Sequence, residues 1–217
     1  MYKIEFHPSN RKTFKAVLLR QLSLYWNQKF FLLQNLSFFI VSVLLFHITA
    51  NTINFEIYLV FLLFSLTLSF DSLLISDYNK RILEQFLLLG INLEVILIAK
   101  ILAHVIFVGV PFIFVILLFD YSTTNLIPEF TTFFVLLLVV TNILLVNLFS
   151  SALCLISKQN MLVVILAIPF IIPTMIFASS AIHEVVYINI LTSIFLLELP
   201  IFLISSAAII KSVIRYQ

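Results

Sequence analysis

The sequence is poor in glycine, cysteine and charge, and each shortage excludes a class of protein. Its two glycines, Gly90 and Gly109, lie too far apart to form the glycine-rich turn that cradles a nucleotide phosphate. The one cysteine, Cys154, excludes an internal disulfide, and the four histidines are too dispersed for metal ligation from one helix. Charged residues make up 10% of the chain, against roughly 25% in soluble domains. Because the glycine-rich turn for a nucleotide phosphate is missing, ATP, if the protein uses it, must bind to another subunit.

Long apolar stretches take the place of the missing charge. Hydrophobic residues make up 63% of the 217 positions. A transmembrane helix needs roughly 20 mostly apolar residues. Runs such as FFVLLLVV at 133–140 lack the alternation of a membrane β-barrel. The sequence therefore predicts one all-α, polytopic membrane domain over residues 1–217, with six transmembrane helices near 30–50, 55–75, 93–119, 131–155, 160–181 and 188–211.

Lysine and arginine are confined to one side of this predicted bundle. Six of the twelve precede the first apolar stretch, three cluster around the link between the second and third, and the others follow the fourth and sixth. In the three links on the opposite side, the charged residues are all acidic. Because Lys and Arg collect on the cytoplasmic side of membrane proteins, both termini are expected to face the cytoplasm. The expected location is the bacterial inner membrane, or alternatively the mitochondrial inner membrane with the termini in the matrix.

Residues 1–29 form a basic segment on the cytoplasmic side. Within it, FKAVLLRQLSLYWN at 14–27 places Phe14, Leu18, Leu22 and Tyr25/Trp26 on one helical face, while Lys15, Arg20 and Gln21 lie off it. A helix of this kind suits the headgroup layer of the membrane, where Trp is enriched. A plain basic tail is the alternative interpretation.

Residues 76–92 form a cytoplasmic link that is unusually apolar. Leu83, Phe86 and Leu87 recur at i, i+3 and i+4, which predicts a short amphipathic helix over 82–89. Gly90 can end this helix by adopting a positive φ. Asn92 can then cap the next helix, with Glu94 in its first turn. The short helix could lie on lipid or dock into a partner protein, and its pattern does not choose between them.

Ionisable residues within membrane segments are costly and are therefore candidates for function. Lys100 can extend its side chain back to the membrane surface, or pair with an acid from the preceding apolar stretch, for which Asp71 is expected. His104 lies deep in the third stretch. Either it hydrogen-bonds to Asn142, Asn147 or a serine, or it has a role with haem or protons.

Three further residues are candidates on the same grounds. Glu198 lies inside the sixth stretch, where it either pairs across the bundle or faces a wet cavity. His47 and His183 fall near the outer surface and are candidates for contact with haem or an extracytoplasmic partner. No motif of an intramembrane protease or hydrolase is present in the sequence.

Two blocks of sequence resemble a known family. The first is the run Asp77, Leu83-Glu84-Gln85, the break at Gly90, Ala99-Lys100, Ala103-His104, Gly109 and Pro111. The second is Ile168-Pro169-Phe170-Ile171-Ile172-Pro173 followed by Ile176-Phe177-Ala178. Both are similar to the CcmB family, the membrane subunit of the ABC transporter for cytochrome c-type biogenesis, also called haem exporter protein B. The sequence departs from this family's pattern at Arg81, where Gly is usual, at Gly90, where Pro is usual, and at Val105, where Trp often occurs.

The resemblance implies an ABC-2 type permease bundle with an N-terminal interfacial helix and a cytoplasmic coupling helix between the second and third spans. It implies a non-catalytic subunit, with docking of a separate ATPase, CcmA, at Leu83, Glu84, Gln85 and Phe86. The other implied partners are the membrane subunits CcmC and CcmD and the haem chaperone CcmE, and no nucleic acid is expected. Haem is implied as transported or transient ligand, not as a firmly bound cofactor. The alternatives are an ABC-2 permease for lipid or drug and, less favoured, an intramembrane enzyme.

Overall fold

The computed structural model describes residues 10–27, 29–49, 54–124, 130–157, 161–182 and 184–215. These segments form helices joined by short turns, and no strand occurs within them. The elements in chain order are α1 (Asn10–Asn27), α2 (Lys29–Thr49), α3 (Phe55–Asn79), α4 (Ile82–Leu88), α5 (Leu93–His104), the π-helix η1 (Val105–Gly109), α6 (Val110–Thr124), α7 (Phe130–Ser157), α8 (Met161–Ala181) and α9 (Val185–Arg215). The all-α prediction is confirmed.

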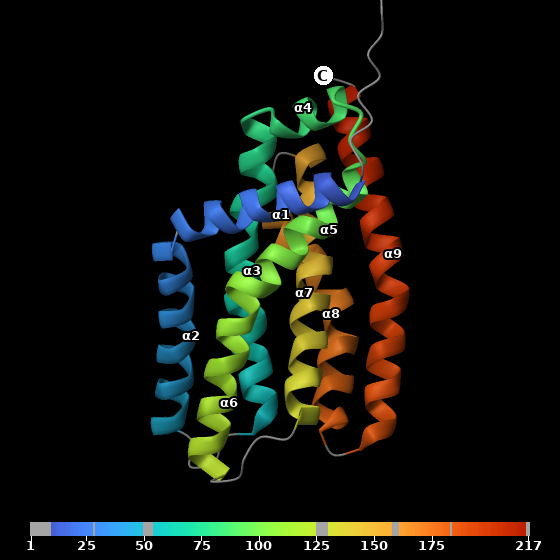
Figure 1. Ribbon diagram of the computed structural model, residues 1–217. Helices are drawn as coiled ribbons and strands as arrows, with labels where there is room; N and C mark the ends of the chain where they lie inside the picture. Colours follow the sequence, from blue (N-terminus) through green and yellow to red (C-terminus); the bar gives the residue numbers. More distant parts are fainter. Residues whose placement is uncertain are drawn as a thin grey trace, which may run out of the picture.

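The long helices form a bundle around α7. Helix α7 packs against α9, α8 and α3, and the continuous rod α5–η1–α6 runs beside it (Figure 1). Most of α7 is buried, as the run from Asn142 to Leu148 illustrates. A helix surrounded by others must be apolar all round, which explains why its sequence shows no polar face. Helix α2 lies at the edge of the bundle and packs mainly on α3.

Each of the six predicted apolar stretches coincides with a helix or with the α5–η1–α6 rod. Within the described parts of the chain, four helical segments are long and apolar enough to cross a membrane: Leu32–Thr49, Leu93–Ser122, Phe130–Ile156 and Val185–Arg215. Helices α3 and α8 contribute shorter apolar segments, Phe55–Thr67 and Ala167–Ala181. The structure is that of an integral membrane helical protein.

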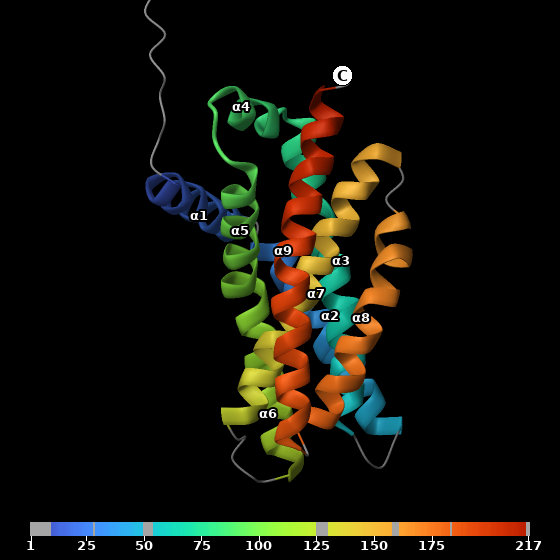
Figure 2. The same cartoon turned by 90° about the vertical axis from the view of Figure 1, so that its right-hand side faces the viewer.

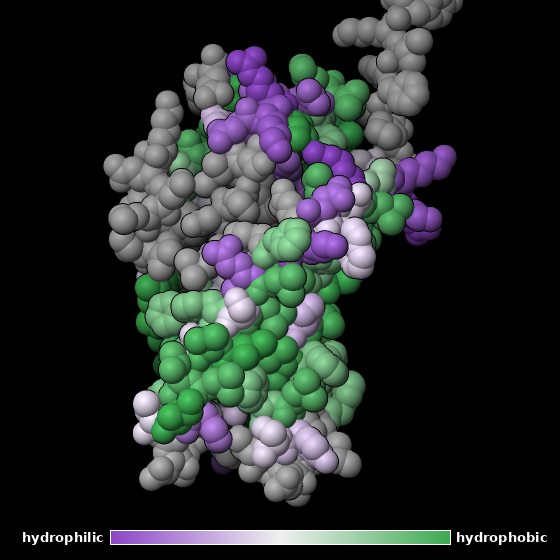
Figure 3. All heavy atoms as spheres, turned by 90° about the vertical axis from the view of Figure 1, so that its left-hand side faces the viewer, coloured by the Kyte–Doolittle hydropathy of each residue, from purple (hydrophilic) through white to green (hydrophobic). Residues whose placement is uncertain are grey.

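Polar residues gather at one end of the bundle. Helix α1 lies across the long helices near that end, and α4 and the C-terminal end of α9 lie beyond it (Figures 1 and 2). In Figure 3, hydrophilic residues concentrate around this end, whereas the body of the molecule below is mainly hydrophobic. This distribution is expected where a bilayer surrounds the body and water meets the end.

Two residues with positive φ define the short helix α4. Arg81 precedes it with φ 55°, and Gly90 follows it with φ 68°. The predicted break at Gly90 is confirmed, since glycine adopts this left-handed conformation without a Cβ clash. Arg81 adopts the same left-handed conformation although it carries a Cβ.

The third apolar stretch contains a widened turn. Val105–Gly109 form a π-helix, in which the Val110 N–H bonds to the carbonyl of Val105. Pro111 follows, and it has no N–H to donate to Phe107. A π-turn at this place shifts the hydrogen-bond register just before the proline. Gly109 lies against Val140 of α7, so the two helices approach closely there.

Candidate functional site

Helix α1 buries a stripe that is more polar than predicted. The buried residues are Thr13, Val17, Gln21 and Tyr25, spaced four apart on the face that packs against α5. The predicted apolar face, represented by Leu18, lies beside this stripe and is half-buried. The prediction of a helix is confirmed; of the predicted apolar face, Tyr25 belongs to the buried stripe, and the stripe also includes Gln21, which was placed off that face. The reason is that α3 and α5 present charged and polar groups at this position, and Gln21 and Tyr25 meet them.

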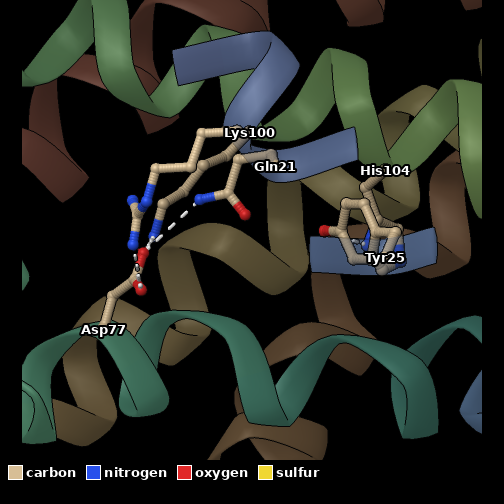
Figure 4. A network of polar contacts seen from close by, with 6 residues as sticks. Gln21, Tyr25, Asp77, Lys100 and His104 are labelled. Atoms are coloured by element: carbon tan, nitrogen blue, oxygen red, sulfur yellow. Dashed lines mark hydrogen bonds and ion pairs between the residues drawn. The ribbon is translucent and has the colours of Figure 1, made fainter. Parts of the chain in front are cut away.

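A buried ionic cluster joins α1, α3 and α5. Lys100 Nζ forms an ion pair with Asp77 Oδ2, and the two residues are 3% and 6% exposed. Arg20 places a guanidinium nitrogen 3.7 Å from Asp77 Oδ1, and Gln21 Nε2 donates to Oδ2 at 3.5 Å. Figure 4 shows Lys100 and Gln21 beside the Asp77 carboxylate. One acid thus holds two cations and an amide, and the pairing offsets the cost of burying the charges.

The acid that pairs with Lys100 therefore differs from the expected one. Asp77 lies near the end of α3 and six positions after Asp71. The side chain of Asp71 lies outside the described part of the structure, so its own contacts stay a prediction. Asp77 was identified in the sequence only through the family resemblance, because it fell in the predicted link 76–92, where a carboxylate carries no signal that it turns inward.

A second polar contact lies one helical turn further along α5. The Tyr25 hydroxyl is 2.9 Å from Nδ1 of His104, whose side chain is 1% exposed (Figure 4). The Tyr25 ring also stacks on Phe107, with 5.5 Å between ring centroids. Burial raises the pKa of the Tyr25 phenol, and the Asp77 carboxylate adds to this shift, so the hydroxyl keeps its proton. Tyr25 was not among the predicted partners of His104, which were Asn142, Asn147 or a serine.

Two of the three candidate histidines, His47 and His104, lie far apart in the structure. His47 is exposed in the last turn of α2, at the end of the bundle opposite α1, whereas His104 is buried beneath α1. His183 lies outside the described residues. A pair of histidines that would clamp a haem between them is thus not formed by His47 and His104.

Of the four residues of helix α4 that were predicted to dock a partner, the structure buries one. Leu83 is fully buried against the protein, so it is not available for direct docking. Glu84 and Phe86 are partly buried and Gln85 is exposed. The most exposed apolar residues are those that follow, Leu88 at 87% and Leu89 at 58%.

Phe86 connects α4 to the N-terminal helix. The Arg20 guanidinium lies over the Phe86 ring, 5.8 Å from its centroid, in cation–π geometry. A groove of about 410 Å³ lies between the two elements; its lining residues are Lys12, Thr13, Ala16, Val17, Phe86, Leu89 and Ile91. Arg20 therefore contacts both the ionic cluster through Asp77 and the short helix through Phe86.

An exposed ion pair closes the same end of the bundle. Lys211 Nζ of α9 lies 3.1 Å from Glu94 Oε1 of α5. Glu94 is in the first turn of α5, as predicted. Asn92 occupies the predicted N-cap position, but the Asn92 side chain makes no capping hydrogen bond. Pairing of Glu94 with Lys211 escaped the sequence analysis because 117 positions separate them and an alternative local role for Glu94 was available.

Comparison with known proteins adds one finding. The family model described as CcmB protein matches residues 12–213 of the 217-residue chain. The matched range includes α4, the ionic cluster and the Tyr25–His104 contact. No curated protein matches the chain significantly.

Proposed function

Because this chain belongs to the CcmB family, whose members are membrane permease subunits of the ABC-type haem exporter for cytochrome c biogenesis, we propose that it anchors a separate ATPase at α4. The chain provides the membrane part of the complex, and ATP hydrolysis takes place in the other subunit. The complex serves the delivery of haem to the chaperone CcmE outside the membrane, with CcmC and CcmD as further membrane subunits. Haem is cargo in this proposal and not a resident cofactor.

The exposure of Leu88 and Leu89 is the observation that carries the docking proposal. These residues lie at the polar end of the bundle, and α4 lies further from the hydrophobic body than α1 does (Figures 1 and 2). If α1 occupies the headgroup layer, α4 extends past that layer toward water. Two leucines exposed in water are costly, and a groove on a soluble partner would cover them.

The way α4 is held supports the same proposal. On its inner side, Leu83 is buried, and the Phe86 ring lies under the Arg20 guanidinium. The turns at Arg81 and Gly90 fix the two ends of the helix. A short helix fixed at this many points presents its outer side in one orientation. Movement of a bound ATPase would therefore pass to α1 through Arg20 and Phe86, and to α3 and α5 through Asp77 and Lys100.

Six transmembrane spans with both termini in the cytoplasm complete the proposal. The four long apolar segments and the two shorter ones supply the helices. Placing the polar end in the cytoplasm of a bacterial inner membrane agrees with the distribution of Lys and Arg along the sequence.

Co-purification of the ATPase tests the docking site. The variant Leu88→Ser/Leu89→Ser removes the apolar surface from α4, while Leu19→Ser changes a residue of similar exposure on α1, 55% against 58% for Leu89. If the pair fills a groove on the ATPase, affinity should fall by roughly thirtyfold or more, and c-type cytochromes should be lost while the permease level stays normal. Leu19→Ser should retain the ATPase. An α4 variant that retains the ATPase and still makes c-type cytochromes would show that α4 lies on lipid instead.

A further inference from the structure

Glu198 lies at the centre of a membrane-spanning helix and lines a groove on the outside of the bundle. It is thirteen residues from Val185 and thirteen from Lys211 on α9, or about 20 Å from each at 1.5 Å per residue. The groove has a volume of about 570 Å³ and lies between α8 and α9, which run side by side in Figure 2. Its lining residues are Pro173, Val186, Asn189, Ile190, Ser193, Ile194, Leu197 and Glu198.

One of the two oxygens of the Glu198 carboxyl is not satisfied within the described part of the chain. Its Oε2 atom is buried and has no hydrogen-bond partner there. The Asn142 side chain of α7 lies beside it, but the amide does not reach hydrogen-bond geometry. A carboxyl at the middle of a bilayer costs roughly 3 kcal/mol to place there when it lacks a partner. Some group outside the described chain is therefore needed to stabilise it.

The groove is polar along part of its length. Asn189 and Ser193 are exposed one turn apart on the same helix, and Glu198 follows them. Leu197 and Val186, 62% and 64% exposed, supply an apolar surface beside them. Serine and asparagine at this kind of position bring helices together in membranes, because hydrocarbon offers no hydrogen bonds to compete.

Lipid is a poor occupant of this groove. The nearest headgroups lie about 15 Å from the centre of the hydrocarbon core, and acyl chains cannot donate a hydrogen bond to a carboxyl. Lipid in the groove would leave Glu198 in the unfavourable state just described.

A second copy of the chain is also a poor occupant. Two copies in one membrane share the same orientation, so a twofold axis between them runs along the membrane normal. Each residue then meets residues at its own depth, and where the two grooves face each other across the axis Glu198 faces Glu198. Two adjacent carboxyls oppose each other's ionisation, and because an ionised carboxylate only accepts hydrogen bonds, at least one of the two must be protonated before the pair has a donor.

We infer that the α8–α9 groove receives a transmembrane helix from a different subunit, which places a hydroxyl, amide or amine donor at mid-depth against Glu198. This inference rests on the proposed function in taking that subunit to be a membrane component of the same complex. Asn189 and Ser193 contact the same helix nearer the outer surface. The surface on α9 thus recognises one membrane partner, while α4, at the polar end, recognises the soluble one.

Photocrosslinking in native membranes tests the inference. In a Cys154→Ser background, a benzophenone is attached to Ser193→Cys, and to Leu196→Cys, which is 65% exposed but outside the groove lining. The Ser193 probe should conjugate to a peptide from a spanning helix of another subunit of the complex. Glu198→Leu should lower the yield of that conjugate about tenfold, the factor expected for an interhelical hydrogen bond in a membrane. Glu198→Gln, which keeps an acceptor, should retain most of it, and the Leu196 probe should give little.

Three results would overturn the inference: a conjugate with a second copy of the chain, a conjugate with lipid alone, or a yield indifferent to Glu198→Leu. The amount of chain in the membrane is measured for each variant, so a folding failure is not mistaken for lost contact. Retention of the ATPase is scored in the same membranes. If the ATPase is retained and no helix conjugates, the inference fails and the proposed function stands. If no variant retains the ATPase, the docking proposal fails, and the Ser193 conjugates still decide what occupies the groove.

Discussion

The Tyr25 hydroxyl lies 2.9 Å from Nδ1 of His104, although 79 positions separate the two residues in the sequence. The contact fixes the last part of α1 to the point where α5 gives way to the π-helix. Arg20 and Gln21 fix the same helix to Asp77 one turn earlier. Helix α1 is therefore attached to the bundle by directional polar contacts and not only by lying in a headgroup layer.

Tyr25→Phe removes the hydroxyl and keeps the ring that stacks on Phe107. The His104 nitrogen then loses the partner that the structure shows at that atom, in a buried environment. Loss of one such hydrogen bond costs about 0.5–1.5 kcal/mol, so the detergent-solubilised protein should unfold at a lower temperature. Tyr121→Phe, which removes an exposed hydroxyl from α6, is the matched control and should have no effect. Equal melting temperatures for the two variants would contradict a stabilising Tyr25–His104 contact.

Asp77→Asn should be among the most destabilising conservative substitutions in the chain. It removes the negative charge that faces both Lys100 and Arg20, and an unpaired buried charge costs about 3–5 kcal/mol. Lys100→Met should also destabilise, and the double variant should lose less than the sum, because neither charge remains uncompensated. The exposed Lys211–Glu94 pair provides the comparison, with Lys211→Gln costing at most about 1 kcal/mol. The measurement is thermal unfolding of each purified variant, and simple additivity of Asp77→Asn and Lys100→Met would argue against the pair.

Labelling from the two sides of the membrane tests orientation. Cysteines at Asn79 and Ser122, both exposed at the ends of α3 and α6, are introduced separately into a Cys154→Ser chain. The distribution of Lys and Arg predicts that Asn79→Cys reacts from the cytoplasmic side and Ser122→Cys from the other. An impermeant maleimide applied to intact cells and to inverted vesicles distinguishes these cases. Reaction of both positions from one side would refute the orientation.

The positions of the helices could be predicted from the sequence, because hydropathy and length report directly on transfer into a bilayer. The break at Gly90 could also be predicted, since a positive φ is a local property of one residue. The buried face of α1 could be predicted only in part. Gln21 and Tyr25 face inward because Asp77 and His104 are there, and those partners lie 56 and 79 positions away. Hydropathy alone favours the apolar neighbour Leu18 for the same place.

In the candidate site, too, some residues could be recognised from the sequence but their contacts could not. Lys100 and Glu198 were recognised from the sequence because a charge in a membrane segment is conspicuous. Their surroundings were not, since the pairing of Lys100 with Asp77 and the opening of Glu198 onto a groove depend on how α3, α5, α8 and α9 pack. Exposure of Leu88 was hidden for the same reason, because an amphipathic pattern does not reveal which leucine the neighbouring helix covers.

The two ends of α4 should respond in opposite directions to substitution. Arg81 holds φ 55° with a Cβ present, and a left-handed conformation costs a residue other than glycine roughly 1–2 kcal/mol. Arg81→Gly should therefore raise the melting temperature, whereas Arg81→Ala, which keeps a Cβ, should not. Gly90→Ala should lower it, and the cause would be the backbone alone, since a Cβ at Gly90 meets no atom within 4 Å. A rise with Arg81→Ala equal to that with Arg81→Gly would mean that the arginine side chain, not its backbone, is the source of strain.

Gly109 should prove intolerant of any side chain while Val140 faces it. A Cβ at position 109 would lie 2.6 Å from Val140 Cγ1, closer than such atoms approach in proteins. Valine is branched at Cβ and has few rotamers to move into, so α7 and the η1–α6 junction would have to separate. Overpacking of this kind costs about 1–3 kcal/mol, and Gly109→Ala should destabilise the bundle by that amount.

Val140→Ala removes the methyl groups in question, so the double variant Gly109→Ala/Val140→Ala should be more stable than the sum of the single effects predicts. Thermal unfolding of the four proteins completes the cycle. Strict additivity would show that Gly109 is needed for the backbone of the π-turn itself, because that requirement would persist after Val140 is trimmed.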